Sequence, residues 1–345
     1  MFTAVLVGCG AMSARWLDAI SKIEALTIVG LVDVDVARAQ ARAAEFNLVD
    51  VTVGADLKSI VAAVRPDMVF DVVVPEARRE VAITAFEAGC HLLTEKPLAA
   101  SLDDARAILS AAKAHDRLHA VVQNRRYLAE VRRLKRFLAS GVLGQLTGLH
   151  ADFFLGPHFG GFREAMDHVL LLDMAIHTFD VARLLAGSTP TSVYCSEWQP
   201  QGTWYRSGSS AAAIFEFAGG LPFTYRGSWS AIGRRTSWES NWRFTCEHGS
   251  ATWDGFDGLQ AERRTGLREG LFDAVETVEI PVLDPSDRIG GHKGVIEDFL
   301  AAVGSGRAPE TCGADNFLSL AMVFGAISSA ETQARVVIPE QGAPS

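Results

Sequence analysis

The first 35 residues run in an order that few folds allow: a strand, a glycine-rich turn, a helix and a second strand. Residues 3–7 are apolar and β-rich, as in a buried parallel strand, and residues 14–23 have a helical pattern. A second apolar strand is expected over 26–32. Strands that alternate with helices pair in parallel through right-handed crossovers, so the pattern predicts a doubly wound α/β sheet.

The alternation continues to about residue 122 and then changes. We expect further strands at 68–74, 91–94 and 119–122, with helices at 36–46, 56–65, 78–89 and 101–115 between them. Later strands are expected at 146–154, 192–198, 211–217, 221–229, 238–246 and 250–253, joined by turns. Consecutive hairpins favour a largely antiparallel sheet of the α+β type, with a helix at 173–185 on one face. The sequence therefore predicts a Rossmann domain over 1–123 and an α+β domain over 124–345.

The turn after the first strand has the composition of a dinucleotide site. Gly8 and Gly10 fit a tight turn and a close backbone approach to a pyrophosphate, which the following helix N-terminus would bind through its amides. Asp33 ends the second strand, 25 residues after Gly8, where a carboxylate accepts hydrogen bonds from a ribose diol and repels a 2′-phosphate. NAD is therefore expected in preference to NADP. Ser13 replaces the usual third glycine of the motif.

Lys96 follows the predicted strand 91–94 and precedes Pro97, which stops the ladder. Ligands of open α/β sheets bind beyond the carboxyl ends of the strands. The position therefore places Lys96 at the mouth of the cofactor crevice, whereas a lysine at an arbitrary strand end would simply be solvated.

Asp173 and His177 interrupt a Leu-rich helical run at a spacing that puts both on one helix face, and Asp180 follows on the same face. Burying such groups costs several kcal/mol unless each finds a partner. A carboxylate beside an imidazole is suited to proton transfer near neutral pH. The alternatives are a hydrogen-bonded core histidine, or a metal site that would need His168 or Asp180 as a third ligand.

Charge and cysteine usage exclude several classes of protein. The net charge of −9 argues against a general nucleic-acid binder. No apolar run approaches the roughly 20 residues that cross a bilayer, and the N-terminus lacks the pattern of a signal peptide. The five cysteines are scattered without CxxC pairs, which favours a reduced, cytoplasmic protein without structural zinc.

Taken together, these motifs resemble those of the Gfo/Idh/MocA oxidoreductase family. The resemblance extends from residue 2 to about 338, and it rests on Gly8-Cys-Gly10, Asp33, the stretch 87–97 ending in Glu-Lys-Pro, Asn124-Arg-Arg-Tyr127 and Asp173-x-x-x-His177. It implies that Lys96 holds the substrate hydroxyl and the cofactor ribose, that the Lys96–Pro97 bond is cis, and that His177 is the general acid/base with Asp173 as its substrate-binding companion. It also implies that the domain 124–345 binds the substrate and builds a homodimer or homotetramer through its sheet.

The chain departs from the family pattern at two further places. Val74-Pro75 stands where relatives often carry Thr-Pro, and Glu164 to His168 replace a Gly-Gly pair upstream of the catalytic helix. These substitutions change the polar groups near the substrate.

The predicted site has three parts and no metal. Cofactor-binding residues are Gly8, Gly10, Ala11, Met12, Asp33, Val74, Pro75, Glu95, Lys96, Asn124 and Arg125. Substrate-binding residues are Lys96, Arg163, His168, Asp173 and His177, of which Lys96, Asp173 and His177 are also catalytic. The expected activity is an NAD(P)-dependent oxidoreductase that transfers a hydride between a sugar, cyclitol or related polyol and the nicotinamide. An NAD-dependent glycosidase that oxidises the sugar transiently, and a non-catalytic sugar and dinucleotide sensor, are the alternatives.

Overall fold

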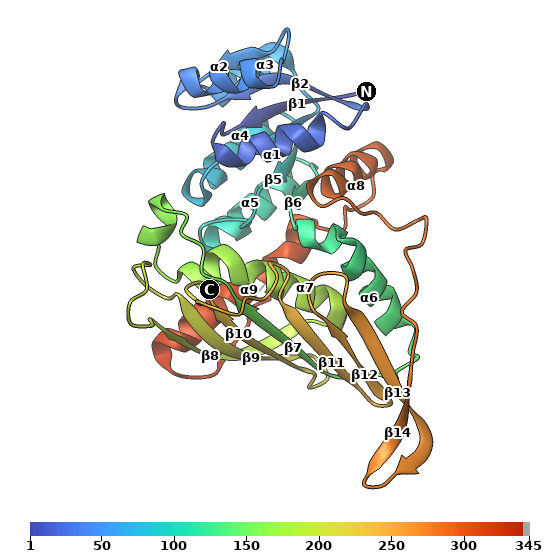
Figure 1. The fold of residues 1–345 in the computed structure, drawn as a ribbon. Helices are drawn as coiled ribbons and strands as arrows, with labels where there is room; N and C mark the ends of the chain where they lie inside the picture. The colour runs from blue at the N-terminus through green and yellow to red at the C-terminus, as the bar shows by residue number, and fades with distance from the viewer. Residues whose placement is uncertain (341–345) are drawn as a thin grey trace. The chain divides into compact units, whose positions relative to one another are not determined.

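The computed structural model describes residues 1–340 and divides them into two compact units (Figure 1). The first unit comprises residues 1–127 and 288–317, and the second comprises 128–287 and 318–340. This division differs from the boundary predicted after residue 123, because residues 124–127 and a later helix belong with the first sheet. The assignment of substrate binding to 124–345 stays a prediction, and residues 341–345 lie outside the described part.

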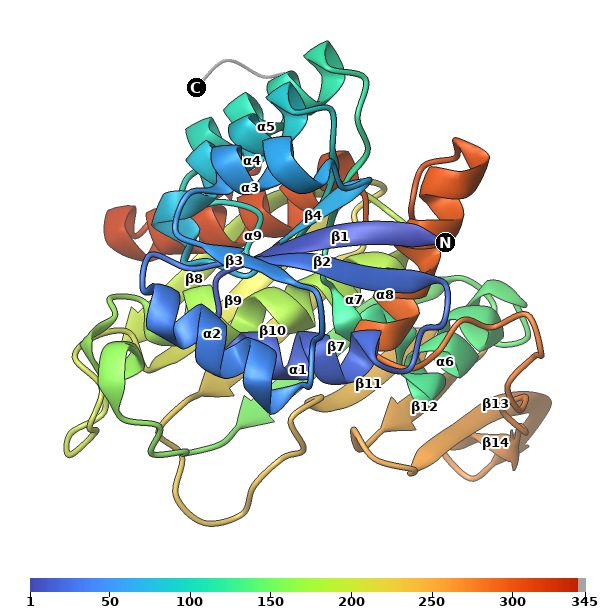
Figure 2. The ribbon, with the colours of Figure 1, turned by 90° about the horizontal axis from the view of Figure 1, so that it is seen from above.

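The first unit is built on a six-stranded parallel sheet of order β3-β2-β1-β4-β5-β6. Its strands are β1 (Phe2–Val7), β2 (Leu26–Val32), β3 (Thr52–Gly54), β4 (Met68–Asp71), β5 (His91–Thr94) and β6 (His119–Val121). The intervening helices are α1 (Ala11–Ile20), α2 (Val36–Glu45), α3 (Leu57–Val64), α4 (Arg78–Glu87) and α5 (Leu102–Ala114). Figure 2 shows α1 and α2 on one side of the sheet and α3, α4 and α5 on the other. The predicted doubly wound fold is confirmed, with its switch point between β1 and β4.

Local sequence determines where several of these helices begin. Asp35 caps α2 by accepting hydrogen bonds from Ala37 N and Arg38 N, and Ser101 caps α5 by accepting one from Asp104 N. Each cap satisfies amides that have no partner inside the helix, which is worth about 1 kcal/mol. The short strand β3 was missed in the sequence because its three residues show no alternation.

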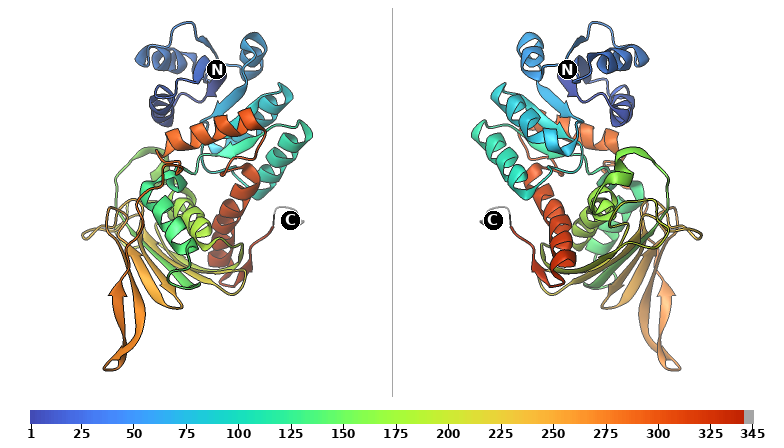
Figure 3. Two further views of the ribbon diagram at one scale, coloured as in Figure 1. Left: turned by 90° about the vertical axis from the view of Figure 1, so that its right-hand side faces the viewer. Right: turned by 90° about the vertical axis from the view of Figure 1, so that its left-hand side faces the viewer.

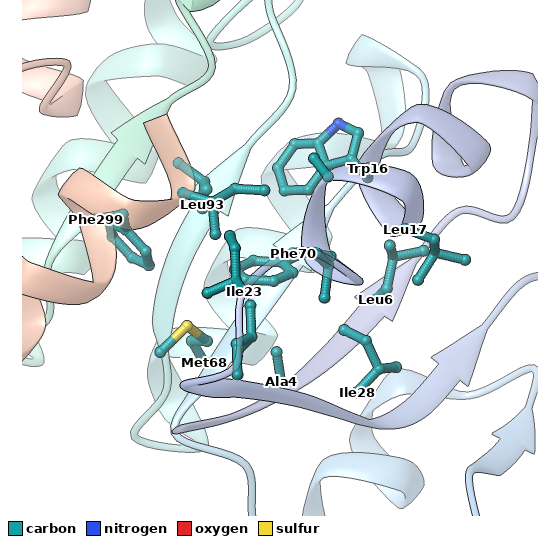
Figure 4. Close-up of a cluster of buried hydrophobic side chains, with 14 of the residues drawn as sticks. Ala4, Leu6, Trp16, Leu17, Ile23, Ile28, Met68, Phe70, Leu93 and Phe299 are labelled. Atoms are coloured by element: carbon teal, nitrogen blue, oxygen red, sulfur yellow. The ribbon is translucent and has the colours of Figure 1, made fainter. Parts of the chain in front are cut away.

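Helix α8 (His292–Ser305) completes the core of the first unit. Val295, Ile296 and Phe299 are at most 1% exposed and belong to the cluster that contains Trp16 and Phe70. Figure 4 shows Phe299 at the edge of this cluster, on the side of Leu93 from β5 and Met68 from β4. Helix α8 thus packs into the Rossmann core, although the whole segment 128–287 separates it in the sequence from the rest of that core.

The second unit is built on a nine-stranded sheet of order β14-β13-β12-β11-β7-β10-β9-β8-β15. The strands are β7 (Leu146–Phe154), β8 (Pro190–Trp198), β9 (Ser210–Phe217), β10 (Pro222–Ser228), β11 (Asn241–Cys246), β12 (Gly249–Trp253), β13 (Leu259–Glu269), β14 (Phe272–Thr277) and β15 (Val336–Val337). All neighbouring pairs are antiparallel except β7 and β10, which confirms the predicted largely antiparallel sheet.

Helices cover one face of this sheet. Helices α6 (Ala129–Ala139) and α7 (Ile176–Ala186) and the later part of α9 (Gly313–Thr332) lie on that side in both views of Figure 3. Phe179 of α7 packs edge-on against Phe215 and Tyr225, with ring centroids 4.7 and 5.2 Å apart. On the other face, Tyr194 and Ile214 are paired across β8 and β9 and are about half exposed. Oligomerisation through this face stays a prediction.

The β13–β14 hairpin extends beyond the rest of the sheet (Figure 3). It was absent from the predicted strands, since nearly every residue of β13 after Ala261 is exposed and the charged sequence has no apolar alternation. All five cysteines are free thiols. Within residues 1–340, no helix is long and apolar enough to cross a membrane.

Candidate active site

The glycine-rich turn lies at the carboxyl edge of the parallel sheet. Gly8 has φ +91°, and a Cβ there would lie 2.7 Å from the carbonyl oxygen of Val72 in the segment after β4. Only glycine combines this backbone conformation with such a close approach. The predicted role of Gly8 in a tight turn therefore has a direct structural reason.

Gly10 is the N-cap of α1, and the space beside it is open. Among the described residues, none lies within 4 Å of a Cβ built on Gly10, and none caps the helix through its side chain. Ala11 and Met12 form the first turn, which contains no acidic residue. This open cradle at a helix N-terminus fits a pyrophosphate, since the uncapped amides and the helix dipole both favour an anion.

Ser13 takes the third glycine position without disturbing the turn. It is fully buried, and its hydroxyl donates to the carbonyl oxygen of Gly10 at 2.6 Å. A small side chain therefore fits where the helix packs on the sheet.

Asp33 follows β2 and is 7% exposed. Its carboxylate accepts hydrogen bonds from Cys9 N at 2.8 Å and from Asp35 N at 2.9 Å, which ties the end of β2 to the glycine-rich turn. Arg38 in the first turn of α2 lies 3.8 Å from Asp33, with its side chain 54% exposed. Arg38 is not among the predicted cofactor-binding residues, because it lies five residues beyond Asp33.

Strand β4 ends at Asp71, three residues before the strand end predicted at Val74. Val74 is 63% exposed, and Pro75 begins a 3₁₀ turn over Pro75–Ala77. The strand stops because the fully buried Asp71 accepts a hydrogen bond from Val73 N at 3.1 Å, which turns the chain out of the sheet.

Next to this loop lies a buried ion pair, Asp71 with Arg78, which the sequence did not predict. Arg78 is 1% exposed, and its Nε lies 3.5 Å from Oδ2 of Asp71. Burial raises the pKa of Asp71 to about 6, with the Arg78 charge opposing the rise. An arginine in the pattern of a surface helix gives no sequence signal of such burial.

Glu95 and Lys96 follow β5 at the same edge of the sheet. Trp16 Nε1 donates to Oε2 of Glu95 at 2.8 Å, and His292 Nε2 lies 3.7 Å from that oxygen. Burial favours the neutral acid, but His292, Trp16 and Lys96 outweigh it and lower the pKa of Glu95. The Lys96–Pro97 bond is cis, as predicted.

Asn124 and Arg125 lie in a 3₁₀ turn over Asn124–Tyr127, and Arg125 is 8% exposed. The neighbouring Arg126 pairs with Asp315 at 2.7 Å. Arg126 thus has a structural partner in the first unit, whereas a cofactor contact by Asn124 or Arg125 stays a prediction.

Asp173 and His177 lie on helical backbone in the second unit, but the helix is not uniform. Residues Leu170–Ala175 form a π-helical segment that continues into α7, where an uninterrupted α-helix was expected. Both side chains are partly buried, and that of Asp173 is 11% exposed. A π turn holds more residues than an α turn, so it changes the direction of the side chains within it, and such turns are frequent at functional sites.

Arg163 is one partner of Asp173. Its Nε donates to Oδ2 of Asp173 at 2.8 Å, and its guanidinium lies 5.0 Å from the ring centre of Phe159 and 4.8 Å from that of Phe162. Two predicted substrate-binding residues thus lie together, and two exposed aromatic rings lie near the guanidinium.

Asp180 and His168 have structural partners. Asp180 is 1% exposed and accepts a hydrogen bond from Ser319 Oγ at 2.7 Å. His168 Nδ1 lies 2.5 Å from Glu197, and its Nε2 lies 3.6 Å from Glu331. The hydrogen bond to Glu197 raises the pKa of His168, against the effect of burial. Substrate binding by His168 stays a prediction.

No group of three or more His, Cys, Asp or Glu side chains within residues 1–340 could hold a metal ion. The donors present instead suit a dinucleotide: an uncapped helix N-terminus, a close glycine turn and a buried carboxylate at the next strand end.

The fold and this edge of the sheet are those of a Rossmann-type dinucleotide-binding protein with a second α+β unit. Residues 2–123 match the model of an oxidoreductase family with an NAD-binding Rossmann fold, and residues 131–252 match the GFO/IDH/MocA C-terminal domain. The chain therefore belongs to the Gfo/Idh/MocA oxidoreductase family.

Individual relatives are distant. An uncharacterized protein y4oX of Sinorhizobium fredii is 26% identical over 97% of this chain and 95% of that protein. An inositol 2-dehydrogenase of Corynebacterium glutamicum is 32% identical over 54% of this chain, which spans about half (55%) of the enzyme's length. The structure of an Agrobacterium radiobacter oxidoreductase in complex with NAD⁺, L-tartaric acid and magnesium covers 98% of this chain and is itself 98% covered, with a TM-score of 0.84 and 19% identity. This last likeness concerns the fold alone.

Proposed function

We propose that the chain is an NAD-dependent dehydrogenase that oxidises a secondary hydroxyl of a sugar, cyclitol or related polyol. The observation that carries the proposal is the shared edge of the first sheet. Gly8 and Gly10 follow β1, Asp33 follows β2 and Lys96 follows β5, and all these strands are parallel. A dinucleotide turn and a cation thus lie at the carboxyl end of one sheet.

The proposed chemistry divides between the residues as follows. When bound, NAD supplies the hydride acceptor. His177 accepts the proton of the substrate hydroxyl, and Lys96 stabilises the negative charge that develops on the oxygen. Asp173 binds a neighbouring hydroxyl, and the hydrogen bond from Arg163 at 2.8 Å fixes the orientation of its carboxylate.

The preference for NAD over NADP is part of this proposal. Asp33 is buried and held by two backbone amides, so its carboxylate is fixed where it would accept hydrogen bonds from a ribose diol. Asp35 adds a second negative charge nearby. Arg38 opposes this preference, since its guanidinium lies 3.8 Å from each of these carboxylates.

The test is His177→Ala, with His115→Ala as the matched control. His115 is exposed at the end of α5, in the first unit. Wild type is first screened with sugars, cyclitols and sugar acids for formation of NADH, measured by the absorbance of the reduced cofactor. On the best substrate, we expect His177→Ala to lower kcat by about 10²–10⁴-fold while NADH binding, measured by fluorescence, is unchanged.

A normal kcat in His177→Ala would exclude the proposed base. Cleavage of a glycoside by wild type without accumulation of NADH would replace the dehydrogenase with a glycosidase. Tight NADH binding with no turnover of any compound would favour a sensor.

A further inference from the structure

Arg78 is a buried cation with partners in two separate loops. Its guanidinium donates to the carbonyl oxygen of Val73 at 2.8 Å and to that of Pro97. The side chain is almost fully buried and lies beside Asp71, which balances its charge. All these residues belong to the first unit.

The two carbonyls mark segments that matter for the proposed reaction. Val73 precedes Val74-Pro75, in the loop that follows β4. Pro97 follows Lys96, in the turn after β5. Strands β4 and β5 are neighbours in the sheet, with Asp71 paired to Thr94 at their carboxyl ends.

A buried ion pair such as Asp71–Arg78 is expected to contribute little to the stability of the folded state. Burying two charges costs several kcal/mol per ion before their attraction is counted. The pair is also incompletely hydrogen-bonded, because neither Nε of Arg78 nor Oδ2 of Asp71 has a hydrogen-bond partner among the described residues. The guanidinium instead donates hydrogen bonds to the carbonyl oxygens of Val73 and Pro97 in the two loops.

We propose that Arg78 is a positioning residue that joins the loop after β4 to the turn after β5 and thereby fixes the place of Lys96 beside the cofactor. The proposal rests on the function proposed above, in which Lys96 acts on the substrate oxygen. Arg78 itself touches neither substrate nor cofactor in this role.

The chemistry of the guanidinium explains why arginine is needed. Its planar fork presents donors in fixed directions, so one side chain reaches carbonyls in two loops. A lysine would keep the charge opposite Asp71 but would present a single ammonium group. Arg78→Lys therefore keeps the positive charge opposite Asp71 but removes the hydrogen bonds that join the two loops.

The matched control is the adjacent arginine. Arg79 has a side chain that is 55% exposed and pairs with Asp104 at 3.1 Å on the surface. Arg79→Lys makes the same chemical change one residue away without touching either loop.

Hydrogen–deuterium exchange of the first unit gives a readout that does not need turnover. In Arg78→Lys we expect amides of the two loops, in peptides covering 72–77 and 95–99, to exchange about tenfold faster, with the rest of the unit as in wild type. We also expect NADH affinity to fall by about 3- to 10-fold and kcat on the best substrate by about 10- to 100-fold. Arg79→Lys should match wild type in all three measurements.

Unchanged exchange in either loop, or wild-type NADH affinity together with wild-type kcat, overturns the proposal. If the wild type turns over no polyol, the proposed function fails, and exchange and NADH affinity alone decide the role of Arg78. If Arg78→Lys does not fold, the double variant Asp71→Asn/Arg78→Gln, which removes both charges, undergoes the same measurements. Failure of both variants to fold would assign Arg78 to the stability of the unit and overturn the positioning role.

Discussion

At the end of β2, a buried carboxylate and a half-exposed guanidinium lie 3.8 Å apart. The two groups have opposite preferences for the adenosine ribose. Asp33 favours a free 2′-hydroxyl, and Arg38 favours a 2′-phosphate. Because Asp33 is held by Cys9 N and Asp35 N, its carboxylate is the more rigid of the two.

Replacing Asp33 should therefore change the cofactor preference. In Asp33→Ser one negative charge is lost and Arg38 keeps only Asp35 of its two carboxylate neighbours. We therefore expect the ratio of NADH to NADPH affinity to move toward NADPH by about 10- to 100-fold. Titration of each reduced cofactor by fluorescence measures the ratio. Asp35→Ser is the control, since serine also caps helices, and its ratio should move less. An unchanged ratio in Asp33→Ser would mean that Asp33 does not select the cofactor.

At the scale of elements, the two glycines before α1 have different roles. Gly8 is needed by the fold, and Gly10 is needed by the ligand. Gly8 has a positive φ and lies against the Val72 carbonyl, whereas Gly10 has φ −69° and open space beside it. The same motif therefore contains two glycines for two different reasons.

Alanine substitutions should show this difference. We expect Gly8→Ala to lower the free energy of unfolding by at least about 2 kcal/mol, through backbone strain and the clash with Val72. Gly10→Ala should cost under about 1 kcal/mol but weaken NADH binding by about tenfold or more, because the methyl group occupies the space beside the helix N-terminus. Urea denaturation and NADH fluorescence measure the two effects. Equal losses of stability in both variants would contradict the distinction.

The elements that could be predicted from the sequence are those with a clear period. Strands β2, β5 and β7 begin and end at the predicted residues, because an apolar run ends in polar or turn residues at each boundary. The β13–β14 hairpin could not be predicted, since its exposed charged residues bury little and leave no pattern. The π turn at Leu170–Ala175 also has no signal, because its hydrophobic spacing suits an α-helix equally well.

The same limit applies to the candidate site. Gly8, Gly10 and Asp33 could be recognised from spacing, because their roles depend on the local backbone. Partners such as Arg78 for Asp71 depend on tertiary packing, and so does Glu197 for His168. Such partners are invisible until the chain is folded.

At the scale of the whole molecule, buried titratable groups set how stability depends on pH. Burial, together with the Arg78 charge, lowers the pKa of His119 to about 3, and its Nε2 lies 3.0 Å from Thr94 Oγ1. The folded state therefore keeps His119 neutral at a pH where the unfolded chain takes up a proton. Stability from His119 is complete above about pH 6.5 and is lost as the pH falls toward 3. Asp71 has the opposite effect on stability. Because the pKa of Asp71 is raised to about 6 in the folded state, the folded protein takes up this proton before the unfolded chain does, and stability rises as the pH falls.

His119→Gln isolates the contribution of this histidine. The free energy of unfolding of wild type should fall faster on acidification than that of the variant, by about 1.4 kcal/mol per pH unit between pH 6 and 4. Urea denaturation at each pH measures both curves, and His115→Gln, at an exposed position, is the control for the substitution itself. Parallel curves for His119→Gln and wild type would show that His119 titrates normally in the folded state.

The interrupted first unit affects how the protein folds during its synthesis. Helix α8 supplies Val295, Ile296, Phe299 and Leu300 to the Rossmann core, yet the ribosome makes it after the whole β7–β14 region. Domains generally fold as units while the chain emerges, N-terminal first. In this protein the core of the first unit stays incomplete, with an exposed apolar surface beside α1, until α8 has been synthesised. Its final packing step therefore follows the translation of about 160 further residues, and chaperones have that interval in which to protect it.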